Sequence, residues 1–126
     1  MREILFKAKR KDNGKWVEGY LYGIWEQRYI CCGMTNDVPN MTEVIPETVS
    51  QYTGLTDKNG NKIWENDIVT IPREDELFVI RWDIEQAAFV IESDMLLCDF
   101  DNYYGKDLEV IGNVFDNADF LKESEE

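Results

Sequence analysis

The side chains that most resemble a metal site are three oxygen-bearing residues in one short segment, Asp57, Asn59 and Asn61. Their spacing is that of the first half of an EF-hand calcium loop, which also needs glycine at its sixth position and glutamate at its twelfth. Lys62 and Ile68 occupy those two positions, so calcium binding is excluded. A tight turn between two strands accounts for all three side chains.

Neighbouring acidic side chains form three other groups, which are Asp99 with Asp101, Asp107 with Glu109, and Glu74 with Asp75 and Glu76. Two carboxylates about 5 to 10 Å apart can hydrolyse a glycosidic bond, and carboxylates also bind magnesium. Most acidic groups of this kind are solvated surface instead. The chain has no histidine, which excludes Ser-His-Asp and Cys-His catalysis and histidine metal ligands. It also lacks a glycine-rich phosphate loop, and we predict no enzymatic activity, cofactor or metal.

The three cysteines, Cys31, Cys32 and Cys98, do not form a disulfide framework, because their number is odd and two of them are adjacent. We expect three reduced thiols that pack as small apolar side chains in a cytoplasmic protein. No apolar run approaches the ~20 residues of a membrane span. The start, Met1-Arg2-Glu3, has no signal-peptide core, so we expect no contact with a membrane.

The charge is distributed unevenly along the 126 residues, whose net charge is −13. Residues 2–15 have a net charge of +4, whereas residues 73–126 have a net charge of −12. The two segments could neutralise each other within one chain, or they could pair head to tail between subunits. Direct binding to nucleic acid is disfavoured, because phosphates would meet a repelling field over most of the surface.

The elements that must position these residues are short strands separated by turns. In the first part we predict strands at 4–9, 16–25 and 29–32, with an Asn13-Gly14 hairpin turn and a long surface loop over 33–47. Further strands are predicted at 51–55, 62–64, 68–71, 77–82, 87–91 and 108–115, with a second Asn-Gly turn at Asn59-Gly60. Residues 94–107 fit either a helical turn or a loop, and 117–121 fit one helical turn.

The pattern predicts one mainly β domain over residues 1–121, built as a small barrel or sandwich. Within it, residues 1–50 form an N-terminal hairpin and loop, and residues 51–121 form the barrel portion. A short C-terminal helical turn precedes a frayed acidic tail at 122–126.

Two blocks of the sequence resemble the YopX family of phage and prophage proteins. The first is QYTGLTDKNG at 51–60 followed by IWENDIV at 63–69, and the second is EVIGNVFDN at 109–117. The opening Phe6-Lys7-Ala8 is similar to the first strand of the family. Asn66 stands where the family pattern more often has glycine, but asparagine also accepts a positive φ. The resemblance spans the whole chain, although residues 33–48 and 84–106 do not contribute to it.

The resemblance implies an SH3-like small barrel in a protein of a bacterial cytoplasm, and it carries no activity over. The signature and turn residues at which this chain matches the family are Tyr52, Thr53, Gly54, Asp57, Asn59, Gly60, Glu65, Asp67, Gly112 and Asn113.

Aromatic side chains of the 16–25 strand form a candidate interface, which comprises Trp16, Tyr20, Tyr22 and Trp25. Both faces of this strand are apolar, so another segment or another subunit must cover one of them. We expect a homo-oligomer that uses these residues. Packing against the segment at 33–48 is the alternative explanation of the same pattern.

Three classes of function remain open at this point. The first is a non-enzymatic interaction module with which a phage modulates a host or phage protein that the sequence does not identify. The second is an acidic DNA mimic that occupies the DNA site of a basic host protein. The third is a small carboxylate-based enzyme, which the missing histidine and phosphate loop disfavour.

Overall fold

The computed structural model describes residues 3–71, 76–93, 97–99 and 106–122. These residues are mainly β, as predicted, and no helix among them is long and apolar enough to cross a membrane. The chain divides into two compact units, Met1–Tyr52 and Thr53–Glu126. The predicted frayed tail lies outside the described residues apart from the backbone of residue 122.

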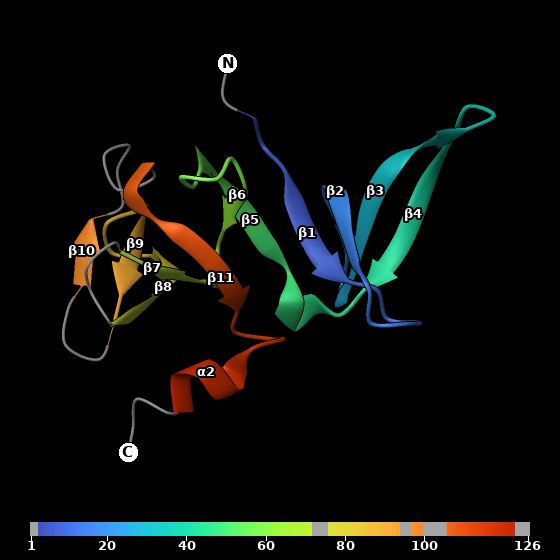
Figure 1. The fold of residues 1–126 in the computed structure, drawn as a ribbon. Helices are drawn as coiled ribbons and strands as arrows, with labels where there is room; N and C mark the ends of the chain where they lie inside the picture. The colour runs from blue at the N-terminus through green and yellow to red at the C-terminus, as the bar shows by residue number, and fades with distance from the viewer. Residues whose placement is uncertain (1–2, 72–75, 94–96, 100–105, 123–126) are drawn as a thin grey trace. The chain divides into compact units, whose positions relative to one another are not determined.

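The first unit is an antiparallel sheet with the strand order β4-β3-β2-β1-β5 (Figure 1). Its elements are β1 (Phe6–Lys9), β2 (Trp16–Ile24), β3 (Gln27–Thr35), β4 (Val38–Val44), the 3₁₀ turn η1 (Pro46–Thr48) and β5 (Ser50–Thr56). The predicted Asn13-Gly14 turn joins β1 to β2, and Gly14 has a φ of +72°. This positive φ is the conformation that an Asn-Gly hairpin turn requires.

The end of β4 returns to the end of β1, so this sheet curls back on itself. The amide of Lys11 donates to the carbonyl of Glu43 at 3.0 Å, and the amide of Ile45 donates to the carbonyl of Lys9 at 2.8 Å. The curled sheet encloses a small core in which Ala8, Ile30 and Val44 are fully buried. Partly buried apolar side chains pack around this core, namely Phe6, Val17, Leu21 and Val49.

The long loop predicted over residues 33–47 is wrong, because most of this segment belongs to the β3–β4 hairpin (Figure 1). Its turn is Asn36-Asp37, where both residues have positive φ, +52° and +67°. Positive φ at both central positions is the geometry of a type I′ hairpin turn, and Asn and Asp tolerate it better than other side chains. Pro39 is accommodated in β4 because this strand borders only β3 over that part.

In the second unit, β6 follows β5 in the strand order, and the remaining strands form a sheet with the order β10-β9-β8-β7-β11. The elements are β6 (Lys62–Trp64), β7 (Asp67–Thr70), β8 (Leu77–Asp83), β9 (Ala88–Glu92), β10 (Leu97–Asp99), β11 (Glu109–Asn113) and the helix α2 (Ala118–Lys122). This unit has its own core, whose fully buried members are Ile63, Val69, Phe78, Ile80, Ile91 and Leu108.

The expected barrel over residues 51–121 is not closed in the described part of the chain. β10 pairs with β9 and β11 pairs with β7, so that these two strands are the edges of an open sheet. Residues 94–107 were predicted as a helical turn or a loop; β10 lies within this segment, and residues 94–96 and 100–105 lie outside the description. The helical turn predicted at 117–121 is confirmed as α2.

Candidate functional site

The signature residue Asp57 is a buried turn cap. Its Oδ1 accepts hydrogen bonds from the amides of Asn59 at 2.9 Å and Asn61 at 2.8 Å, and its Oδ2 accepts one from the amide of Val110 at 3.0 Å. Burial is the largest single effect on this carboxyl group and raises its pKa, but the backbone donors at Val110, Asn61 and Asn59 together lower the pKa below its ordinary value. The carboxylate therefore joins a turn to a distant strand, which is a structural role.

The turn between β6 and β7 contains two further signature residues, Glu65 and Asp67, on either side of Asn66. Asn66 has a φ of +74°, in agreement with the prediction that it can replace glycine there. Its Oδ1 accepts a hydrogen bond from Arg81 Nη1 at 3.0 Å, and buried Asp67 accepts one from the amide of Trp64 at 2.8 Å. Glu65 is the other turn residue and is half-buried.

Gly112 and Asn113 build the turn that leads from β11 to α2. A Cβ at position 112 would lie 2.4 Å from Asn117 Oδ1, so any other residue requires the Asn117 side chain to move. Asn113 Oδ1 accepts hydrogen bonds from the amides of Phe115 and Asp116, and Asn117 Oδ1 accepts one from the amide of Asn113 at 3.1 Å. The side chain of Asn117 thus binds backward in the chain, to the backbone of Asn113.

The remaining signature residues belong to β5 and to the turn after it. Tyr52 is buried and its amide donates to the carbonyl of Leu5 at 2.9 Å. Thr53 Oγ1 donates to the carbonyl of Ile63 at 2.8 Å. Gly54 and Gly60 have φ values of +92° and +84°, the latter as predicted for the Asn-Gly pair.

The acidic groups considered for catalysis do not form a site in the described residues. Glu109 pairs with Lys58 at 3.0 Å, and no group of three or more Cys, Asp or Glu side chains that the structure describes could hold a metal ion. The side chains of Asp99 and Asp101, and residues 74 and 75 of the third group, lie outside the description. Among the residues that the structure describes, every buried side-chain N or O atom has a hydrogen-bond partner.

Apolar side chains are instead exposed on the outer face of the N-terminal sheet. The register places Tyr20 opposite Cys31 and Tyr22 opposite Tyr29, while Met41 lies opposite Cys31 on the next strand. These side chains point away from the core, because the alternate residues of the same strands, such as Leu21 and Ile30, pack into it. Tyr20 is 68 % exposed and Tyr22 is 51 % exposed.

A groove of about 570 Å³ lies on this face, and we call it the apolar groove. Its lining residues are Tyr20, Leu21, Tyr22, Cys31, Val38, Pro39 and Met41. The prediction identified two of them, Tyr20 and Tyr22. The others include β4 residues that the prediction assigned to a loop; the turn residues Asn36-Asp37 between two apolar runs were the signal that could have revealed this hairpin.

The cysteine predictions are correct in part. Cys31 and Cys32 are free thiols, whereas the side chain of Cys98 lies outside the description. Cys31 is half-buried and Cys32 is exposed, so neither is packed as a fully buried small apolar side chain. Cys31 lies on the outer face of the sheet, opposite Tyr20, and Cys32 lies where the β3–β4 pairing is irregular, between Cys31 and Met34.

Trp16 does not line the groove, although it was predicted together with Tyr20 and Tyr22. It is half-buried, and the ammonium groups of Lys7 and Lys9 lie 4.7 and 5.5 Å from the centre of its ring. Such cation–π contacts cover the ring within its own unit.

Trp25 lies in the turn between β2 and β3 and is 92 % exposed, with a φ of +54°. The structure thus places the four predicted interface residues in three different surroundings.

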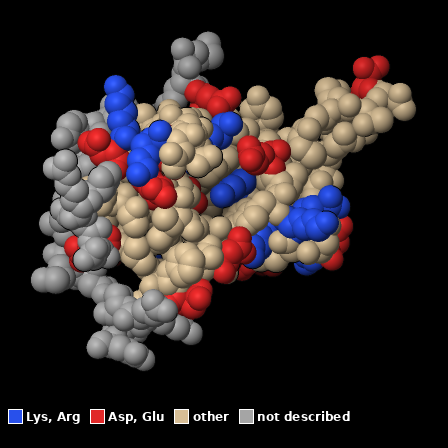
Figure 2. All heavy atoms as spheres, in the orientation of Figure 1, with Lys and Arg blue, Asp and Glu red and all other residues tan. Residues whose placement is uncertain are grey.

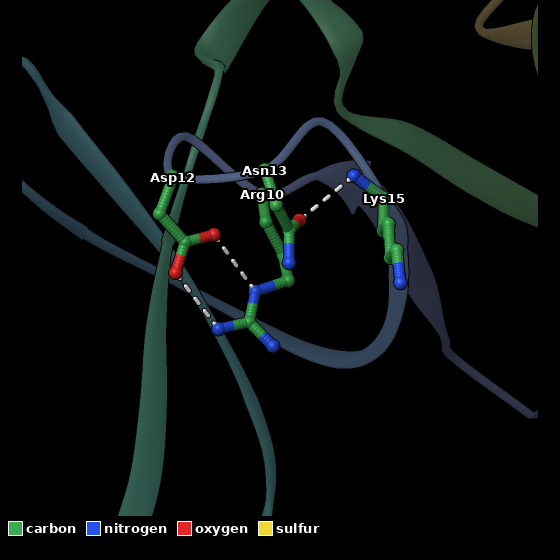
Figure 3. Close-up of polar contacts among 4 residues, drawn as sticks. All are labelled: Arg10, Asp12, Asn13 and Lys15. Carbon is green, nitrogen blue, oxygen red and sulfur yellow. Dashed lines mark hydrogen bonds and ion pairs between the residues drawn. The ribbon is translucent and has the colours of Figure 1, made fainter.

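Two basic residues of the N-terminal segment, Arg10 and Lys11, form ion pairs within their own unit. Arg10 donates to both carboxylate oxygens of Asp12, at 3.0 and 2.9 Å (Figure 3). This hydrogen bond lowers the pKa of Asp12 and raises that of Arg10. In the same turn Asn13 Oδ1 accepts a hydrogen bond from the amide of Lys15 at 2.9 Å (Figure 3). Lys11 pairs with Glu43 of β4 at 3.2 Å.

The two units differ in net charge, which is confined to the second unit. Residues 1–52 contain seven basic and seven acidic side chains, whereas residues 53–126 contain six basic and nineteen acidic ones, a net charge of −13. On the face drawn in Figure 2, the β3–β4 hairpin carries few charged side chains apart from acidic atoms at its tip. The groove therefore lies on an electrically balanced unit.

These observations define a mainly β protein whose signature residues build turns and whose first sheet exposes an apolar groove. A family model described as YopX protein matches residues 5–122. The match covers nearly the whole chain, and the protein belongs to the YopX family, as the two sequence blocks indicated. A search of curated proteins gave no match.

Proposed function

We propose that this protein is a non-enzymatic interaction module that binds protein through the apolar groove of its N-terminal sheet. The observation that supports this proposal most directly is the contrast between two sets of residues. The signature side chains with polar chemistry are engaged in turns, whereas the groove residues Tyr20, Tyr22 and Val38 are more than half exposed. Exposed apolar surface bordered by polar residues is typical of a protein-binding site.

The family association suggests where such a module acts. We place it in the cytoplasm of a bacterial host, encoded by a phage or prophage, with a host or phage protein as its target. An interaction module needs no cofactor, and its action consists of occupying or assembling a protein surface.

The experiment is affinity purification from bacterial cells that also produce an untagged copy of the chain. Tyr20→Thr removes an exposed ring from the groove and keeps a β-branched side chain suited to a strand. The unchanged chain should recover at least one protein, which can be the untagged second copy of this chain. The variant should recover at least tenfold less of that protein. Ile84→Ala is the matched control, because Ile84 is exposed on a different hairpin. Equal recovery by all three chains would contradict the proposal.

A DNA mimic is the second candidate, and the concentration of all net charge in residues 53–126 favours it. Its target would be a basic DNA-binding protein, and the complex would weaken steeply as salt rises, because counterions compete for both surfaces. Binding through the apolar groove would instead change little between 50 and 500 mM salt, a range chosen for the titration to shorten the Debye length from about 14 to 4 Å. The salt dependence of any purified complex separates these two functions.

A further inference from the structure

Trp25 is unusual in both exposure and backbone conformation. Its side chain is 92 % exposed, the highest value among the large apolar side chains that the structure describes, and its φ is +54°. A bulky residue rarely adopts a positive φ, since its Cβ then crowds the backbone. An exposed indole in a strained turn gains nothing within the isolated unit, which points to a contact outside it.

The turn that carries Trp25 is held firmly in place. Arg28 Nη1 donates to the carbonyl of Trp25 at 2.8 Å and to the carbonyl of Gln27 at 3.0 Å. Gly23 makes room for this guanidinium, because a Cβ at that position would lie 3.1 Å from Arg28 Nη1. The indole is thus presented on a turn whose backbone is hydrogen-bonded, and a turn that is already formed loses little conformational entropy on binding.

We propose that Trp25 inserts into the apolar groove of a second copy of this chain. This inference rests on the proposed function, since it names the occupant of the same groove. At about 570 Å³ the groove lies within the range of about 300 to 1,000 Å³ that accommodates small organic groups. Its exposed walls are supplied by aromatic and aliphatic side chains such as Tyr20, Val38 and Met41.

A second copy fits this surface for two reasons. The N-terminal unit has balanced charge, so two such units can meet without bringing net like charge together. The exposed apolar area also approaches what a dimer needs, because one buried aromatic side chain contributes about 150 to 250 Å² and a standard interface takes about 800 Å² from each partner. The other exposed apolar residues of this unit are Ile4, Ile24, Met34, Val38 and Met41.

The first test is the mass of the full-length chain in sedimentation equilibrium at about 10 to 100 µM, where an interface of standard size is populated. We expect a species larger than the 14.8 kDa monomer. Trp25→Asn removes the indole and suits a positive φ, and Val38→Asp places a charge at the edge of the groove; each should weaken association at least tenfold. Ile84→Ala, an exposed apolar residue on another hairpin, should leave the mass distribution unchanged.

The second test maps the contact. A photoreactive benzoylphenylalanine in place of Trp25 should form a cross-link to residues 38–41 of another copy, detected between isotopically labelled and unlabelled chains. A monomeric mass for the unchanged chain, an undiminished oligomer for Trp25→Asn, or cross-links only outside the groove would each overturn the proposal. If the unchanged chain is monomeric, and Tyr20→Thr still reduces the recovery of a different protein in the affinity purification, this inference is overturned. The proposed function would then remain supported.

Discussion

Asp57 shows how a residue that resembles a metal ligand in sequence can serve a different purpose. Its two carboxylate oxygens accept three backbone amides, two from its own turn and one from β11. A carboxylate surrounded by amide donors is stabilised in its charged form. The spacing of Asp57, Asn59 and Asn61 therefore reflects the geometry of a turn.

Replacement of Asp57 by Asn should destabilise the protein by about 2 kcal/mol, because an amide nitrogen cannot accept the hydrogen bond from Val110 and charge-assisted bonds are lost. Denaturant unfolding measures this difference. Asp119→Asn on exposed α2 is the control and should change stability by less than about 0.5 kcal/mol. An equal effect of both substitutions would show that the cap contributes nothing.

The same carboxylate should make stability depend on acidity. Its pKa is lowered on folding from an ordinary value of 3.8, so its contribution is complete well above that pH and is lost as the pH falls through the folded pKa. The difference in unfolding free energy between the unchanged chain and Asp57→Asn should therefore shrink below about pH 4. A constant difference between pH 7 and pH 2.5 would contradict the lowered pKa.

Gly60→Val tests the Asn-Gly turn beside this cap. Open space surrounds the position that a Cβ would take, so the whole effect should come from a φ of +84° that a β-branched residue avoids. We expect a loss of about 1 to 2 kcal/mol in thermal unfolding. Asn59→Val in the same turn has no positive φ to maintain and should cost less.

Turns were the elements that the sequence predicted best where an Asn-Gly pair was present. Gly14 and Gly60 both have the expected positive φ. The β3–β4 hairpin was missed because its turn is Asn36-Asp37, a weaker signal, and because Pro39 argues against a strand. Proline is compatible with an outer strand, and that position in the sheet is not visible in a single sequence.

The bulge of β11 allows a test of the close approach between Gly112 and Asn117. Gly112→Ala would place a Cβ 2.4 Å from Asn117 Oδ1, and we expect a loss of about 1 to 3 kcal/mol. Combining it with Asn117→Ala, which removes the obstructing atom, should cost less than the sum of the two single substitutions. If the losses in unfolding free energy of the two single variants simply add up in the double variant, the close approach between Gly112 and Asn117 is relieved in another way.

The candidate groove was predictable only in its β2 half. Period two places Tyr20 and Tyr22 on one face of a strand, and that much follows from the sequence. Trp16 obeys the same period but is covered by Lys7 and Lys9, which approach it from the neighbouring strand. The β4 wall, with Val38 and Met41, depends on a strand pairing that short-range patterns do not specify.

In the part of the chain that the structure describes, each of the two units has a core of its own. Ile30→Ala and Ile80→Ala each truncate a fully buried side chain and should cost about 2 to 5 kcal/mol locally. Hydrogen exchange should then accelerate mainly in residues 3–52 for the first variant and in residues 53–122 for the second. Equal acceleration in both units by either variant would show that the chain unfolds as one cooperative body.

The hydrogen bonds that join the first family block to residues 108–114 have a consequence for cleavage of the chain. Asp57 accepts from the amide of Val110, the amide of Lys58 donates to Leu108, and the amide of Val114 donates to Asn66. These bonds join segments more than forty residues apart along the chain. A protease that cuts the exposed β8–β9 turn at Glu85 should therefore leave two peptides that stay together and migrate as one particle, and the separated peptides should reassemble when mixed.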